Sequence, residues 1–361
     1  MEELVPFKPI PILKFPELVN RHILLTTTPS QIFLMSLCSQ KTKEMLNKSM
    51  FKVDEIWIDL KKSCGSPRIT FLIRVNGKEF NVLYLEECQN QQVEHLLAEF
   101  GVFSEYKFIE DTVVFSSNLG VRIDPVNKLH KYVCDLFHCD SSQIYVKTDF
   151  FKKLCMFNDE SVGRCILSRV TNHQMHCDLE RFFQRHSNQL ISIIEFLPLR
   201  VAIDFRVRTH HLSIIKSSSV ILRNFNDSAY YMWQFEGQHL LCENARINSD
   251  SINEILLKWG TNCMNNLKSI IIYHLAEFDC STILNYVTSN KTATELAIKV
   301  EEWDAAKRAS VYPYQSIISH YHTFSPDTFD CSNGMDIVRN SDSKRATIKL
   351  SPQHFMFFVW P

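Results

Sequence analysis

Residues 13–46, LKFPELVNRHILLTTTPSQIFLMSLCSQKTKEML, decide the N-terminal part of the fold. They contain three segments with helical spacing, of which the first begins at Pro16 and the second at Pro29. Thr28 and Gln31 predict a capping box, in which each side chain accepts a hydrogen bond from a backbone amide that the helix leaves free. Proline suits the first helical position, because its nitrogen has no hydrogen to satisfy. The stretch therefore predicts a module of three short helices.

This module carries more apolar surface than it can bury by itself, because a chain of about forty residues forms only a small core. The apolar residues follow helical spacing in the first two segments. They are Val19, Ile23, Leu24, Ile32, Phe33 and Leu37. The module therefore needs a partner surface, which is either another protein or the rest of this chain.

The composition is that of an ordinary folded protein, with 45% hydrophobic and 22% charged residues in a chain of 361. The net charge of −1 gives no general attraction to nucleic acid or membranes. Residues 1–52 hold seven basic and four acidic residues, which indicates either a mildly acidic partner or a solvated basic face. The N-terminus lacks the pattern of a signal peptide, and no apolar run reaches the length of a membrane helix. We expect a cytoplasmic or nuclear protein whose twelve cysteines are reduced.

After residue 52 the apolar pattern changes from helical to alternating, which predicts strands at residues 53–60, 69–75 and 80–85. The Asn76-Gly77 pair between the last two predicts a hairpin with a type I′ turn. Residues 91–100 have apolar side chains at helical spacing and are followed by Gly101, which predicts a short helix.

The rest of the chain alternates between strand and helix patterns, which favours parallel strands joined by crossovers. Expected strands are 112–115, 144–146, 164–170, 190–196, 219–222, 239–241 and 267–273. Expected helices are 124–137, 175–185, 251–260 and 282–287, and residues 149–157 form a mixed polar and apolar segment. Ser251 is expected to cap its helix and Gly260 to end it. Both a doubly wound sheet and a leucine-rich-repeat-like array fit, and the absence of glycine-rich turns favours the array. Residues 336–339, 346–350 and 355–360 predict a C-terminal antiparallel β meander, so the expected fold class is α+β (α/β-rich).

The opening stretch resembles an F-box. Phe15-Pro16-Glu17 corresponds to the family's Leu-Pro-x-Glu opening, Ile23-Leu24 to the apolar pair that closes its first helix, and Pro29 to the start of its second helix. Leu37-Cys38-Ser39 and Lys41 follow the family's order of apolar, small and basic residues. The tryptophan usual in the third helix is absent, and Thr42 or Met45 stands nearby. This departure is similar to the divergent F-boxes of nematodes.

The C-terminal half resembles the type 2 F-box-associated domain of those nematode proteins. Residues 219–273 carry the likeness through a strand, the Ser251, Asn253, Leu257 and Trp259 pattern, and an Asn-Leu-Lys strand start. Residues 336–339, 346–348 and 358–360 are similar to the family's final segment. Residues 61–212 carry little of the likeness.

The resemblance implies a substrate-recognition subunit of a Skp–cullin–F-box ubiquitin ligase, without catalysis or a cofactor of its own. It implies an F-box at residues 8–52, a leucine-rich-repeat-like domain at 53–330 with the F-box-associated region near 200–275, and a meander at 331–361. The Skp adaptor, and through it a cullin, would be the partners, together with an unknown target protein. The implied adaptor contacts are Leu13, Phe15, Pro16, Val19, Ile23, Leu24, Pro29, Ile32, Leu37 and Cys38. The alternative is an interaction scaffold in which these residues pack internally.

Other candidate sites have weaker sequence support. Cys134, His138 and Cys139 form one potential zinc cluster, and His173, His176 and Cys177 another, but neither provides four ligands at the spacing of a structural site, so we expect no metal. No local signature marks a cysteine nucleophile. The basic residues Arg206, Arg208, His210 and His211 are expected to be a solvated surface rather than a nucleic-acid site. The aromatic residues Tyr230, Tyr231, Trp233 and Phe235 suit one core face of a strand better than a target-binding strip.

Overall fold

The computed structural model describes residues 14–48, 53–63, 66–87, 95–97, 101–103, 105–109, 112–117, 124–139, 144–148, 162–170, 183–184, 189–196, 216–224, 232–245, 247–274, 279–289, 298–302, 304–314, 318 and 328–361. The chain forms two compact units, residues 1–150 and 151–361. Both contain helices and strands, which confirms the predicted mixed α+β class. None of the helices in these ranges is long and apolar enough to cross a membrane.

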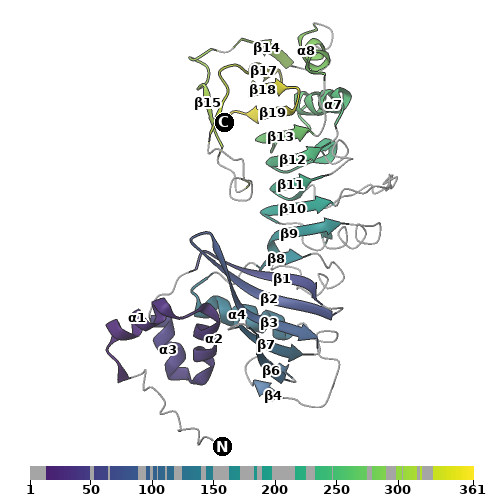
Figure 1. The fold of residues 1–361 in the computed structure, drawn as a ribbon. Helices are drawn as coiled ribbons and strands as arrows, with labels where there is room; N and C mark the ends of the chain where they lie inside the picture. The colour runs from purple at the N-terminus through teal and green to yellow at the C-terminus, as the bar shows by residue number, and fades with distance from the viewer. Residues whose placement is uncertain are drawn as a thin grey trace, which may run out of the picture. The chain divides into compact units, whose positions relative to one another are not determined.

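The first unit begins with three short helices, as the opening stretch predicts (Figure 1). They are α1 (Glu17–Thr26), α2 (Pro29–Cys38) and α3 (Gln40–Lys48). The capping box of α2 is confirmed, because Oγ1 of Thr28 accepts from the Gln31 amide at 3.3 Å while Oε1 of Gln31 accepts from the Thr28 amide at 3.0 Å. The predicted proline stands at the first position of α2.

A mixed sheet follows, with strand order β8-β1-β2-β3-β7-β6 in this unit. Its strands are β1 (Glu55–Ser63), β2 (Ser66–Val75), β3 (Lys78–Glu87), β6 (Glu105–Ile109), β7 (Thr112–Ser117) and β8 (Ile144–Thr148). The predicted hairpin is confirmed, because β2 and β3 pair antiparallel around Asn76 and Gly77, whose φ angles of 50° and 76° suit a type I′ turn. Helix α4 (Asp124–Leu136) begins at the predicted Asp-Pro and packs against α2 and α3.

The helix predicted at residues 91–100 is wrong where the structure describes it. Residues 95–97 form strand β4 (His95–Leu97), which pairs antiparallel with β5 (Gly101–Phe103). The apolar spacing fits a helix over this window, but pairing with the next residues of the chain takes precedence over so short a periodic signal. The segment 149–157 predicted after β8 lies outside the described residues, as does the helix predicted at 175–185 apart from residues 183–184, which are helical.

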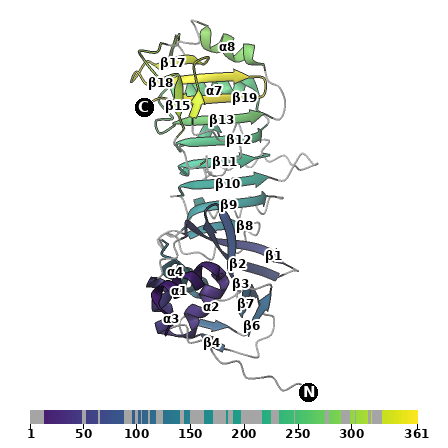
Figure 2. The same cartoon turned by 60° about the vertical axis from the view of Figure 1, so that its left-hand side comes forward.

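The second unit is built on parallel strands that lie side by side in chain order (Figure 2). They are β9 (Val162–Val170), β10 (Ile191–Phe196), β11 (Ser219–Arg223), β12 (His239–Ala245) and β13 (Ser269–His274). Each pairs with the next in parallel, and Ile193, Ile221, Leu241 and Ile271 occupy one lateral row of the ladder. This order confirms the predicted parallel crossovers and differs from that of a doubly wound sheet, in which the chain reverses direction across the sheet.

The sheet continues into an antiparallel meander, as predicted for the C-terminus. β19 (His354–Val359) pairs with β13, β18 (Arg345–Ser351) with β19, β17 (Met335–Arg339) with β18, and β14 (Ile298–Glu301) with β17. The hairpin of β15 (Val311–Pro313) and β16 (Thr328–Asp330) forms a separate small sheet. The predicted turn at 340–343 is confirmed, with Ser343 in the left-handed region at φ 61°.

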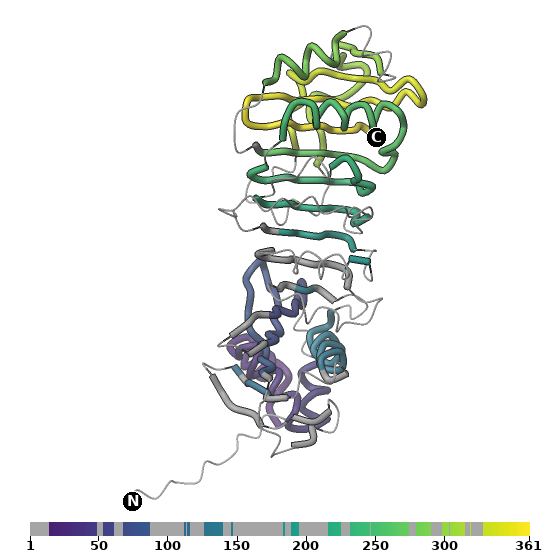
Figure 3. The backbone as a smooth tube through the Cα atoms, turned by 90° about the vertical axis from the view of Figure 1, so that its right-hand side faces the viewer, coloured from purple at the N-terminus to yellow at the C-terminus, as the bar shows by residue number. Residues whose placement is uncertain are grey.

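The two faces of this sheet are covered by different elements. Helix α7 (Ser249–Gly260) lies over β13 and β19, where the Trp259 and Phe357 rings are 5.3 Å apart (Figure 3). Tyr312 and Phe329 of the small hairpin pack on the opposite face against Phe358, at ring distances of 4.8 Å each. Helix α8 (Cys280–Thr288) packs against α7. Apolar side chains therefore fill both faces of the ladder at its C-terminal end.

The expected cap of α7 is wrong by one turn. Asn248, not Ser251, is the N-cap, because its side chain accepts from the Ser251 amide at 2.9 Å. Asparagine and serine are comparable caps, so the alternative starts cannot be told apart from the capping pattern alone. At the other end Gly260 still belongs to the helix, and Thr261 is the C-cap.

Two buried arginines join the meander to its surroundings. The Arg308 guanidinium donates to the Asp336 carboxylate at 2.8 Å, and this carboxylate also accepts from the Thr347 hydroxyl at 2.7 Å. Arg339 donates to the carbonyl of Trp259 at 3.1 Å, at the end of α7, and to Asp342 at 2.8 Å. Asp336 and Arg339 are fully buried. These bonds satisfy polar groups that would otherwise be costly to bury.

Candidate protein-binding surface on the N-terminal helices

Helix α1 presents an apolar surface to solvent. Leu18 is 79% exposed and Leu25 is 69% exposed. Seven residues make almost two full helical turns, so the two leucines lie on one face about 10 Å apart, with His22 between them. The inner face of α1 carries Asn20 and Leu24, which are buried. This helix therefore turns a leucine stripe away from its own unit.

Helix α2 faces the opposite way, into the unit. The Phe33 ring is fully buried and makes edge contacts with the rings of Phe115 in β7, at 6.3 Å, and Tyr132 in α4, at 5.9 Å. The Tyr132 hydroxyl donates to Oγ of Ser36 at 2.9 Å. Aromatic edge contacts and buried apolar area hold α2 on the sheet. Much of the apolar surface that the sequence assigned to a partner is thus internal.

Ser39 immediately precedes helix α3, and its hydroxyl accepts from the Thr42 amide at 3.1 Å. Thr42, one of the two residues near the position of the missing tryptophan, is buried. The Lys43 ammonium lies 3.9 Å from the centre of the Tyr132 ring, a cation–π distance that ties α3 to α4. At the end of α3, Nε2 of His138 and the carbonyl oxygen of Asn47 are 2.8 Å apart.

The residues implied as adaptor contacts divide into three groups. Pro16, Val19 and Cys38 are exposed; Phe15, Ile23 and Leu37 are half-buried; Leu24, Pro29 and Ile32 are buried. Leu13 lies outside the described residues. Leu18 and Leu25 are not among the contacts implied from the sequence, although the segment has more apolar residues than a single helical stripe needs. Their spacing of seven places them on one face of the helix, but it does not show that this face is the exposed one.

Only one of the two clusters considered for zinc lies in the described part of the chain. His173, His176 and Cys177 lie outside the described residues. In the other cluster, Sγ of Cys134 lies 3.5 Å from Nε2 of His130, one turn earlier in α4. Burial lowers the pKa of His130 to about 4. The described ranges contain no group of three or more residues placed to hold a metal ion.

Buried cysteines and histidines of the second unit are core residues. Burial raises the pKa of the Cys242 thiol, and it raises that of Cys331 to about 11, which makes both poor nucleophiles. His239 and Ser269 pair across neighbouring strands, with Nδ1 and Oγ 2.9 Å apart. Burial, together with the charge of Lys268, lowers the pKa of His239 to about 4. Both partners of this pair are buried.

The predicted aromatic strip at residues 230–235 contains both a core side chain and an exposed side chain. Phe235 is 2% exposed and belongs to the core, whereas Trp233 is 47% exposed. The Lys258 ammonium lies 5.0 Å from the centre of the Trp233 ring and donates to its backbone carbonyl. Tyr230 and Tyr231 lie outside the described residues, as do the basic residues 206–211.

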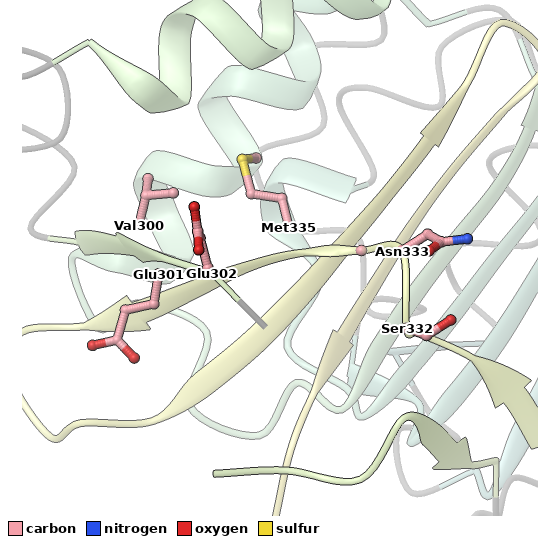
Figure 4. A pocket seen from close by; sticks show the side chains of 7 residues that line it. Val300, Glu301, Glu302, Ser332, Asn333 and Met335 are labelled. Carbon is pink, nitrogen blue, oxygen red and sulfur yellow. The ribbon is translucent and has the colours of Figure 1, made fainter. Parts of the chain in front are cut away.

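A pocket of about 460 Å³ opens in the second unit, between the end of β14 and the turn before β17 (Figure 4). It is lined by Val300, Glu301, Glu302, Ser332, Asn333, Gly334 and Met335.

Comparison with known proteins gives no relative for this chain: no family model matches it, and neither does any curated protein or solved structure.

Proposed function

We propose that this chain is the substrate-recognition subunit of a Skp–cullin–F-box ubiquitin ligase, with its N-terminal helices bound to the Skp adaptor. The observation that carries the proposal is the exposed leucine stripe of Leu18 and Leu25 on α1. Burying a leucine stabilises an interface by about 1.5–3 kcal/mol, so two leucines favour a partner that covers them. A helix face offered to an apolar groove is a common mode of protein recognition.

The burial of each residue limits which of them the adaptor could contact directly. Pro16 and Val19 stand beside the leucine stripe and are exposed. Leu24 and Ile32 instead hold the helices together and would act on the adaptor only by keeping α1 in place. An interface of about 800 Å² per partner requires more than α1, and half-buried Leu37 on α2 is a further candidate contact.

The second unit supports a role in presenting a target. Parallel strands that follow one another in chain order are the arrangement found in leucine-rich-repeat-like arrays, which commonly bind proteins on an extended surface. In the proposed assembly the chain contributes no chemistry. It would hold a target near the catalytic subunits, and proximity by itself raises the rate of transfer.

Co-purification with the Skp adaptor tests this proposal. The purified full-length chain is mixed with purified adaptor and isolated on a tag. Leu18→Asp with Leu25→Asp is expected to weaken binding more than 100-fold, because about 3–6 kcal/mol of apolar contact is lost. Leu284→Asp is the matched control, since Leu284 is an exposed leucine on α8. Equal binding by the two variants, or no binding by the unchanged chain, would rule out the proposal.

The second candidate function is an interaction scaffold in which the F-box-like helices are purely structural. The inward packing of Phe33 on Phe115 and Tyr132 favours it, because α2 is already covered. It differs from the ligase proposal in one outcome: the unchanged, folded chain would not bind the adaptor.

A further inference from the structure

The pocket beside β14 has one apolar wall and one carboxylate, that of Glu302, for which the described residues provide no partner. Val300 and Glu302 are two residues apart and point to the same side, while Glu301 between them points to the other (Figure 4). The Met335 side chain lies on the side of Val300 and Glu302. A chain with an apolar stem and a cationic end could lay its stem along Val300 and Met335 and reach Glu302 with its charge.

The two glutamates of the pocket differ in their partners. Glu301 is bonded to Lys299 at 3.0 Å, Lys307 at 3.1 Å and Arg345 at 3.0 Å. Hydrogen bonds from these three cations lower the pKa of Glu301 to about 2. Glu302 is exposed, and no residue of the described ranges pairs with its carboxylate. Because three cations already compensate Glu301, the carboxylate left to pair with a cationic ligand is that of Glu302.

Strand β14 also offers a backbone edge. In the described part of the sheet it is the terminal strand and pairs with β17 alone. An unpaired edge presents amide and carbonyl groups to which an extended segment can add as another strand. Such strand addition supplies affinity through backbone hydrogen bonds, and an adjacent pocket supplies side-chain selectivity.

We propose that the edge of β14 and this pocket bind an extended peptide segment that places a lysine or arginine side chain against Glu302. The peptide backbone pairs with β14, the aliphatic stem contacts Val300 and Met335, and the cation pairs with the carboxylate. The occupant is a segment of another protein. Calling it the ligase target rests on the proposed function, whereas the binding itself does not.

A displayed library of random seven-residue peptides is the probe, selected on the unchanged full-length chain. We expect lysine or arginine to be enriched at one position. Selection on Glu302→Gln, which keeps the size of the side chain and removes its charge, is expected to lose this enrichment. Glu254→Gln is the control, because Glu254 is an exposed glutamate on α7, and it should retain the enrichment. No basic preference, or the same preference on Glu302→Gln, would overturn the proposal.

Two further measurements locate the site and quantify the charge. A selected peptide should slow hydrogen exchange at the amides of residues 298–301, whereas protection confined to other strands would exclude the β14 edge. Replacing its lysine with norleucine should weaken binding about threefold to fivefold, as expected for a partly exposed ion pair. Peptide binding is independent of adaptor binding: the Leu18→Asp with Leu25→Asp chain should bind the peptide, and Glu302→Gln should bind the adaptor.

Discussion

Ile32→Ala is expected to destabilise the first unit by about 3 kcal/mol without removing an exposed contact. Ile32 is 2% exposed, on the helix that packs against β3 and β7. Truncating a buried isoleucine removes its transfer free energy and leaves a cavity, which together cost about 2–5 kcal/mol. For a unit of this size, 3 kcal/mol corresponds to a fall in Tm of roughly 6–12 °C.

Thermal unfolding followed by circular dichroism measures the loss, and hydrogen exchange assigns it to residues 1–150. The control is Leu25→Ala, which removes the same kind of atoms from a side chain that is 69% exposed and should change stability by less than about 0.5 kcal/mol. The two variants should have the opposite order of effect on adaptor binding. Leu25→Ala should weaken binding, whereas Ile32→Ala should leave it unchanged at a temperature where the unit is folded. A stable Ile32→Ala chain with lost adaptor binding would show that Ile32 contacts the adaptor directly and that α2 does not bury it in the unit.

Two other predictions concern the second unit. Because the folded-state pKa of His239 is about 4 and the unfolded value is about 6.5, the folded state binds the proton less well, so stability is lost as pH falls from 6.5 toward 4. Between pH 7 and pH 5, the free energy of unfolding measured in urea should fall by about 2 kcal/mol more in the unchanged chain than in His239→Asn. An equal fall in both chains would refute the low pKa of His239. Asn248→Ala should cost about 1 kcal/mol and Ser251→Ala less, and the reverse order in urea unfolding would restore the predicted cap at Ser251.

Local signals in the sequence predicted much of the fold where they were strong. The Thr28-Pro29 capping box, the Asn76-Gly77 turn and the strand runs of the second unit appear in the structure because each depends on residues adjacent in the chain. The helix predicted at 91–100 failed because strand pairing of 95–97 with 101–103 is a contact that periodicity does not encode.

The candidate surface was harder to predict, since it depends on which side of each helix meets the sheet. Apolar spacing marked Val19, Ile23 and Leu24 on α1, but a helix rich in leucine has apolar residues on more than one side. The structure buries Leu24 and exposes Leu18 and Leu25, because the Asn20 and Leu24 side faces the unit. That orientation is a tertiary property, and no residue pattern within α1 determines it.

The residues that carry the C-terminal resemblance are informative about packing rather than about a target. Asp336 and Arg339 are buried and bonded to Arg308, Asp342 and the end of α7, and Trp259 packs on Phe357. Removing one partner from such a buried pair leaves an uncompensated charge, so these positions are constrained by folding whatever the protein binds. In the proposed ligase, target selectivity therefore has to come from exposed positions that the fold leaves free to vary. Glu302 follows the terminal strand of the described sheet, is exposed, and has no partner among the described residues, as such a position requires.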